Sequence, residues 1–188
     1  MKNILITGGL GFIGSALTKR LHNKYPDYKL IVVDNNEDHH RLDEIKDNIK
    51  IYSYDICEQR LIDKLFELYT FDGVFHLASK KPIVNEEYKG TEFIKTNVLG
   101  TSLILNNCVK HNSRLLYTSN TEVYGSLEMD KRTHLYETNC YNPSTPYAAS
   151  KASADHLITS YHEKYGLDTL IANISNTYGP GQDDGDFM

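Results

Sequence analysis

Short apolar runs alternate along this chain with longer segments that carry apolar residues at helical spacing. The runs are four or five residues long and mostly rich in β-branched or other apolar residues, which is typical of strands buried on both faces of a sheet. They are Asn3–Thr7, Leu30–Val33, Ile49–Ser53, Gly73–His76, Leu115–Thr118 and Thr169–Ala172. The pattern therefore predicts that these runs form one buried sheet.

The segments between the runs predict helices. Gly14–Asn23 and Leu61–Tyr69 carry apolar residues near positions i, i+3, i+4 and i+7, and Lys95–His111 and Pro146–Tyr165 predict two longer helices. Strands that alternate with helices are joined by right-handed crossovers and lie parallel. We therefore expect an α/β fold with an open, doubly wound parallel sheet, formed as a single domain by residues 1–188.

Composition narrows the classes of protein that remain. Hydrophobic residues make up 40% of the 188 residues and charged residues 24%, as in ordinary globular proteins. The net charge of -5 argues against a nucleic-acid partner, which needs a basic face. No run approaches the roughly 18 apolar residues of a membrane span, and the apolar N-terminal run is too short for a secretion signal. We expect a soluble, cytoplasmic protein without a membrane partner.

The cysteines point to the same compartment. Cys57, Cys108 and Cys140 are odd in number and far apart, so they suggest neither a disulfide framework nor a metal site. Free thiols fit the reducing cytosol. We therefore predict no bound metal.

The first predicted strand runs directly into a glycine-rich turn, TGGLGFIG. Gly9, Gly11 and Gly14 satisfy the spacing GxGxxG, and Gly8, Gly11 and Gly14 satisfy GxxGxxG. Such a turn needs glycine for its tight bend, for close approach of the backbone to a pyrophosphate, and for close packing of helix on strand. With a strand before it and a helix after it, the turn predicts a Rossmann-type dinucleotide site. The alternative is a purely structural turn in a domain that binds no nucleotide.

An acidic residue stands where this type of site needs one. Asp34 ends the second predicted strand, 20 residues after Gly14, where a carboxylate accepts hydrogen bonds from the ribose hydroxyls of the adenosine. A carboxylate there also repels a 2′-phosphate, so NAD is favoured over NADP. Asp55 and Ile56 follow the third strand and are expected near the adenine.

Tyr147 and Lys151 begin the last predicted helix and share one of its faces, since they are four residues apart. A lysine charge close to a phenol favours the phenolate. We therefore predict that Tyr147 acts as a base below its ordinary pKa of about 10.

Taken together, the motifs resemble those of the extended short-chain dehydrogenase/reductases. The likeness is closest to the nucleotide-sugar 4,6-dehydratases, dTDP-glucose 4,6-dehydratases above all, and UDP-glucuronate decarboxylases and UDP-glucose 4-epimerases are near relatives. Besides the glycine turn and Asp34, the segments that carry the likeness are His76–Ala78 (HLA), Thr96–Thr101 (TNVLGT), Glu122–Gly125 (EVYG), Pro143–Leu157 (PSTPYAASKASADHL) and Ser175–Gly181 (SNTYGPG).

The resemblance implies roles for individual residues. Tyr147 would take the proton of the sugar 4-hydroxyl, Lys151 would hold the nicotinamide ribose, and Glu122 would take the C5 proton. Asn176 would face the diphosphate of a nucleotide-diphosphate sugar, and a homodimer would form through the two long helices. The residues implied to contact NAD are Gly8, Gly11, Phe12, Ile13, Gly14, Asp34, Asp55, Ile56, Leu77, Ala78, Asn97, Tyr147 and Lys151.

The chain departs from the family pattern in two ways. Asn120 stands where the family has Ser or Thr, so either a flanking hydroxyl of Ser119 or Thr121 serves, or the Asn120 amide replaces it as donor. Thr121 also replaces the acid of the dehydratases, which leaves a decarboxylase or a 4-epimerase open. Family members continue for well over a hundred residues into a C-terminal substrate domain that is missing here, so a catalytically impaired NAD-binding module or a truncated fragment is the remaining alternative. His76 is expected to be a packing residue without chemistry.

Overall fold

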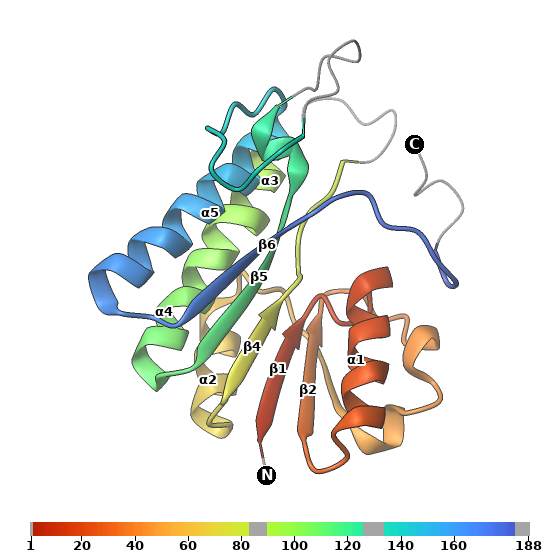
Figure 1. Cartoon of the computed structure of the whole chain (residues 1–188). Helices are drawn as coiled ribbons and strands as arrows, with labels where there is room; N and C mark the ends of the chain where they lie inside the picture. The colour runs from red at the N-terminus through yellow and green to blue at the C-terminus, as the bar shows by residue number, and fades with distance from the viewer. Residues whose placement is uncertain (1, 83–89, 126–133, 183–188) are drawn as a thin grey trace.

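The computed structural model contains one parallel sheet. In the part of the chain it describes, residues 2–82, 90–125 and 134–182, six strands lie in the order β3-β2-β1-β4-β5-β6 (Figure 1). This is the strand order of a doubly wound Rossmann sheet, as expected. The strands are β1 (Asn3–Thr7), β2 (Lys29–Asp34), β3 (Lys50–Ser53), β4 (Gly73–His76), β5 (Arg114–Asn120) and β6 (Thr169–Ile174).

Helices cover both faces of the sheet. Figure 1 shows α1 on one face and α2, α4 and α5 on the other. The helices are α1 (Phe12–Lys24), α2 (Gln59–Leu68), α3 (Gly90–Phe93), α4 (Thr101–His111) and α5 (Pro146–Tyr165), with short 3-10 turns at η1 (His40–Leu42), η2 (Lys46–Asn48) and η4 (Thr121–Tyr124). None of the helices within the described ranges is long and apolar enough to cross a membrane.

The helix predicted over Lys95–His111 is not uniform. Its first part is a π-helix, η3 (Ile94–Gly100), and only its second part is the α-helix α4. Two contacts accompany the wider turn: the Thr101 hydroxyl donates to the carbonyl of Asn97, and Gly100 packs against Ile56 so closely that a Cβ would lie 2.6 Å from its Cδ1 atom. Apolar periodicity does not report such a local change of helix type.

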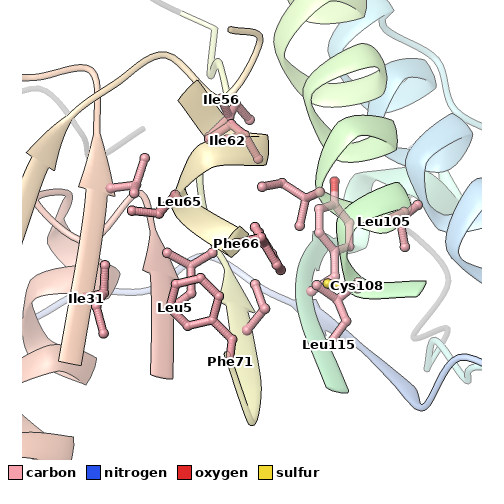
Figure 2. Close-up of a cluster of buried hydrophobic side chains, with 14 of the residues drawn as sticks. Leu5, Ile31, Ile56, Ile62, Leu65, Phe66, Phe71, Leu105, Cys108 and Leu115 are labelled. Carbon is pink, nitrogen blue, oxygen red and sulfur yellow. The ribbon is translucent and has the colours of Figure 1, made fainter. Parts of the chain in front are cut away.

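Side chains that alternate along the strands pack into two separate hydrophobic cores, one on each face of the sheet. Leu5, Ile31 and Val33 point into the core beneath α2, α4 and α5, while Ile4 and Ile6 point into the core beneath α1. This follows because successive side chains of a strand point to opposite faces. Figure 2 shows the larger core, where side chains of the sheet meet those of α2 and α4; the labelled residues include Leu5, Ile31, Leu65, Phe66 and Leu105.

The topology places several polar residues at one edge of the sheet. Parallel strands all end at the same edge, and the chain reverses its direction of winding between β1 and β4, which leaves a crevice there. Thr7 and His76, the last residues of β1 and β4, are paired in the register. α5 begins near the same edge: Thr145 caps it by accepting from the amide of Ala148 at 3.0 Å, and Pro146 is its first residue.

Packing in the larger core leads to a stability prediction for two substitutions on α2. We expect Leu65→Ala to lower the free energy of unfolding by about 2–5 kcal/mol, since the Leu65 side chain is fully buried and its loss leaves a cavity. Leu68→Ala on the same helix is the control, because Leu68 is 63% exposed, and it should cost less than about 1 kcal/mol. Urea unfolding of both variants measures the difference, and equal losses would mean that α2 does not pack as described.

Candidate functional site

A cavity of about 650 Å³ lies at the carboxyl ends of the strands. Most of the residues implied to contact a dinucleotide line it, although they come from distant parts of the sequence. Those that line it are Gly8, Gly11, Phe12, Ile13, Gly14, Asp34, Asp55, Ile56, Leu77, Ala78, Tyr147 and Lys151, together with Ser119, Asn120 and Asn176. Asn97, Thr121 and Glu122 are not in the lining.

The glycine turn forms a cradle that no side chain could share. Gly8 has a φ of +70°, and a Cβ there would lie 2.6 Å from the amide nitrogen of Ala78. A Cβ on Gly14 would collide with the carbonyl oxygen of Gly8. Gly11 precedes α1, and no side chain caps the helix amides. The turn therefore presents bare backbone and the positive end of a helix dipole to the cavity, which suits a phosphate group.

Asp34 is held rigidly at the rim of this cradle. One carboxylate oxygen accepts from the amide of Leu10 and the other from the amide of Asn36, both at 3.0 Å. Each oxygen keeps a further acceptor site, since an ionised carboxylate can accept about four hydrogen bonds. The residue can therefore bind hydroxyl groups without giving up its own structural contacts.

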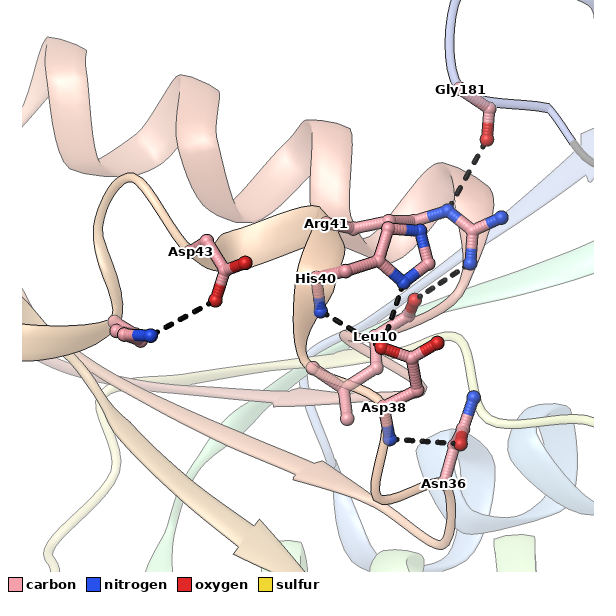
Figure 3. A network of polar contacts seen from close by, with 8 residues as sticks. Leu10, Asn36, Asp38, His40, Arg41, Asp43 and Gly181 are labelled. Atoms are coloured by element: carbon pink, nitrogen blue, oxygen red, sulfur yellow. Dashed lines mark hydrogen bonds and ion pairs between the residues drawn. The ribbon is translucent and has the colours of Figure 1, made fainter.

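Arg41 is a residue of the cavity wall that the sequence analysis did not identify. Its Nε donates to the carbonyl of Gly181 at 3.2 Å, and one terminal nitrogen donates to the carbonyl of Leu10 at 3.5 Å (Figure 3). The side chain thus joins the glycine turn to the segment after β6. No motif marks a lone arginine in a short 3-10 turn, so spacing alone could not have found it.

The third strand supplies the next part of the wall. Asp55 accepts from the amide of Cys57 at 2.9 Å and forms an ion pair with Lys95 at 3.5 Å. Ile56 is buried against Gly100. An apolar side chain and a fixed carboxylate thus lie side by side, an arrangement that fits an adenine ring.

Lys151 is buried at the floor of the cavity. Its Nζ donates to the carbonyl of Thr118 at 2.6 Å and lies 4.3 Å from the ring centre of Tyr117. Burial lowers the pKa of Lys151 to about 8, and the Asp155 carboxylate acts in the opposite direction. The ammonium group is therefore still mostly protonated at pH 7.

The expectation that Lys151 lowers the pKa of Tyr147 is wrong for this structure. Burial, and then the charge of Glu122, raise the pKa of Tyr147 to about 12. The side chains of Ser79 and Asn120 act in the opposite direction. Lys151 does not offset burial and Glu122, because its ammonium group is directed to the carbonyl of Thr118.

The residues around Asn120 have separate surroundings. The Ser119 hydroxyl is buried and donates to Asp155 at 2.7 Å, so its proton is engaged away from Tyr147. The Asn120 side chain accepts from the amide of Glu122 at 2.7 Å, and it also acts to lower the pKa of the Tyr147 phenol. Asn120 is thus a β5 residue whose side chain influences the phenol.

Asn97 lies behind the wall instead of in it. Its amide is buried and contacts Ser79 and Lys80, which do line the cavity. Sequence reasoning missed Ser79, although its place directly after the HLA segment at the end of β4 could have identified it. Asn176 lines the cavity, and its role toward a substrate diphosphate stays a prediction.

Comparisons with known proteins agree with this geometry. The family model described as GDP-mannose 4,6 dehydratase matches residues 5–187. A dTDP-glucose 4,6-dehydratase of Mycobacterium tuberculosis is 37% identical over 182 residues, which cover 95% of this chain and 54% of that protein.

Solved structures show the same likeness. A dTDP-glucose 4,6-dehydratase of Bacillus anthracis, in complex with NAD, aligns with a TM-score of 0.86 at 31% identity over 97% of this chain and 57% of that one. A UDP-glucose 4-epimerase of Thermotoga maritima, solved with UDP-glucose, aligns with a TM-score of 0.87 at 30% identity over 96% and 58%.

The extent of the match places the chain in a family. This chain spans little more than half the length of the relatives it matches, while those relatives cover nearly all of it. The match to the family model includes the glycine turn, the strands at both edges of the sheet and the Tyr147–Lys151 pair. The chain therefore belongs to the GDP-mannose 4,6 dehydratase family of extended short-chain dehydrogenase/reductases.

Proposed function

We propose that residues 1–188 form the NAD-binding domain of an enzyme that oxidises a nucleotide-diphosphate sugar at C4, with 4,6-dehydratase chemistry as the best-supported outcome. The observation that carries the proposal is that one cavity holds the bare glycine cradle, Asp34 and the Tyr147–Lys151 pair. The named dehydratase relatives and the NAD complex of one of them support it. Because the relatives are enzymes by name, they favour an enzyme over a non-catalytic cofactor-binding module.

The residues present fit a dinucleotide. The amides that open α1 would hold the pyrophosphate, Asp34 the adenosine ribose, and Asp55 and Ile56 the adenine. Leu77 and Ala78 would form the floor, and Lys151 would hold the nicotinamide ribose. When bound, NAD supplies the acceptor for the C4 hydride.

We assign to Tyr147 the removal of the proton from the sugar 4-hydroxyl. With a pKa of about 12, the phenol keeps its own proton at pH 7, so the phenolate must be stabilised before it acts as a base. The side chains of Asn120 and Ser79 act to lower the pKa of the phenol, but burial and Glu122 outweigh them. The Asn120 amide can polarise a substrate oxygen in place of a hydroxyl, but it cannot relay a proton as a hydroxyl does.

Glu122 and Asn176 are assigned to the substrate. Glu122 is close enough to Tyr147 for its charge to raise the pKa of the phenol, which suits a base that removes the neighbouring C5 proton after oxidation. Asn176 would face the diphosphate. Thr121 stands where the dehydratases have an acid, which weakens the elimination step. The second candidate is therefore 4-epimerisation, which the structure of the UDP-glucose 4-epimerase supports. The third candidate is the decarboxylation of UDP-glucuronate.

We also propose that the protein forms a homodimer through α4 and α5. A cytoplasmic location is part of the same proposal, because the free thiols of Cys57, Cys108 and Cys140 fit a reducing compartment. We propose no metal and no nucleic-acid partner.

Asp34→Ala tests the cofactor assignment. We expect the affinity for NAD to fall by about 10- to 100-fold, because hydrogen bonds to a charged group are lost, and the preference over NADP to shrink. Isothermal titration with both dinucleotides measures this. Asp38→Ala is the matched control, since Asp38 lies in the segment directly after β2, contacts His40 and is not in the cavity lining. Unchanged affinity of Asp34→Ala for both dinucleotides would defeat the assignment.

Asn120→Thr tests the chemistry. Threonine can still cap η4 and restores a hydroxyl beside Tyr147, so we expect sugar oxidation to rise at least about tenfold, within the range of general acid–base effects. The assay incubates the protein with NAD and either dTDP-glucose or UDP-glucose and follows the 4-keto product. Asn120→Ala, which supplies neither hydroxyl nor amide, should be the slowest form. A rate unaffected by Asn120→Thr would mean that Ser119 or Thr121 already serves.

A further inference from the structure

We propose that His76 is a positioning residue. As a neutral imidazole protonated on Nε2, it joins the end of β1 to Thr101, the first residue of α4 directly after the π-helix η3, and thereby aligns the glycine turn with the helix that carries Tyr147. The functional part of this inference rests on the proposed function, because it assumes that NAD binds at the turn. The assignment of the ring tautomer and of its hydrogen bonds does not depend on NAD binding.

The hydrogen bonds around His76 fix which ring nitrogen donates and which accepts. Thr101 donates its single hydroxyl proton to the carbonyl of Asn97 at 2.7 Å, so it can only accept from the Nε2 of His76 at 3.0 Å. Nδ1 of the neutral ring is then an acceptor, and it receives the hydroxyl proton of Thr7 at 2.6 Å. The Thr7 oxygen in turn accepts from the amide of Ala78 at 3.3 Å. The ring is therefore the Nε2–H tautomer.

Burial keeps the ring neutral. His76, Thr7 and Thr101 are all fully buried. A second ring proton would point at Thr7, whose own proton already occupies that bond, and burial together with the charge of Lys151 lowers the pKa of His76 to about 3. His76 therefore does not act as an acid or base at neutral pH.

Thr101 holds the backbone carbonyl of Asn97, and the side chain of Asn97 makes a second set of hydrogen bonds. Its oxygen accepts from the amide of Lys80 at 2.7 Å and from the Ser79 hydroxyl at 3.0 Å. Its nitrogen donates to the carbonyl of Lys80 at 3.1 Å and to the Ser150 hydroxyl at 2.9 Å, and Ser150 donates to the carbonyl of Tyr147 at 2.7 Å. All four hydrogen-bonding sites of the amide are thus engaged, which fixes Asn97 between the β4 loop and the first turn of α5.

Two sets of hydrogen bonds, which meet at the backbone and the side chain of Asn97, therefore reach both halves of the proposed site. At one end, Ala78 lies against Gly8 with no room for a side chain, so the bond from its amide to Thr7 holds the floor of the cofactor cradle. At the other end, Asn97 holds the backbone turn from which the Tyr147 phenol projects. Because buried polar networks lose their rigidity when one member is left unsatisfied, a break at His76 should be felt at both ends.

Thr101→Val and Thr101→Ser form the test. Valine has nearly the shape of threonine but cannot accept from Nε2, whereas serine keeps the hydroxyl. In ¹⁵N-histidine NMR of the wild-type chain, we expect His76 to show one protonated and one unprotonated ring nitrogen, unchanged from pH 8 to pH 5. Thr101→Val should give a mixture of tautomers and shift the side-chain amide signals of Asn97, and Thr101→Ser should retain the wild-type pattern.

Titration with NAD supplies the second readout. We expect about tenfold weaker NAD binding by folded Thr101→Val, from one buried unpaired N–H, and binding within about twofold of wild type by Thr101→Ser. A His76 that protonates near pH 6, or that carries its proton on Nδ1, would overturn the inference whether or not NAD binds. Absence of NAD binding by the wild-type chain would instead defeat the proposed function and leave the tautomer result standing. Unchanged NAD affinity of Thr101→Val would reduce His76 to a packing residue.

Discussion

The close approach of backbone to backbone between the glycine turn and the end of β4 is the constraint on which the site depends. Gly8 adopts a left-handed conformation against the amide of Ala78, and Gly14 lies against the carbonyl of Gly8. Side chains are excluded from both contacts, so the four-residue turn between β1 and α1 leads into the helix with no side chain of the described residues capping its amides. The rest of the cavity is assembled around this bare stretch of backbone.

The sheet brings the other groups to the same place. β1 lies between β2 and β4, so Asp34 at the end of β2 and His76 at the end of β4 flank the turn on either side. β5 contributes Asn120, and α5 begins close to it with Tyr147 and Lys151. Each group reaches the cavity because parallel strands end at a common edge.

Much of this arrangement follows from local sequence. Apolar runs predicted all the strands described here to within a few residues, and the pattern is plainest in β1 and β2, which are buried on both faces. Gly8, Asp34 and Tyr147 were predictable because each has a fixed spacing from an element boundary. The start and end of α5 were also predicted, since Pro146 favours the first helical position and Gly166 ends the helix in a left-handed conformation.

Properties that depend on three-dimensional surroundings were not predictable. The pKa of Tyr147 is raised because burial and Glu122 outweigh the donors around it, and neither effect can be read from a four-residue spacing. The hydroxyl of Ser119 is engaged by Asp155 on another element. Likewise, tertiary contacts of Gly100 and Thr101 accompany the π-helix, and periodicity does not contain them.

A crystal structure of the chain soaked with NAD tests the central claim most directly. We predict that the diphosphate lies against the amides at the start of α1 and that the adenosine ribose hydroxyls lie within hydrogen-bonding distance of the Asp34 carboxylate. A dinucleotide bound elsewhere, or a turn filled by side chains with Asp34 directed into solvent, would contradict the account.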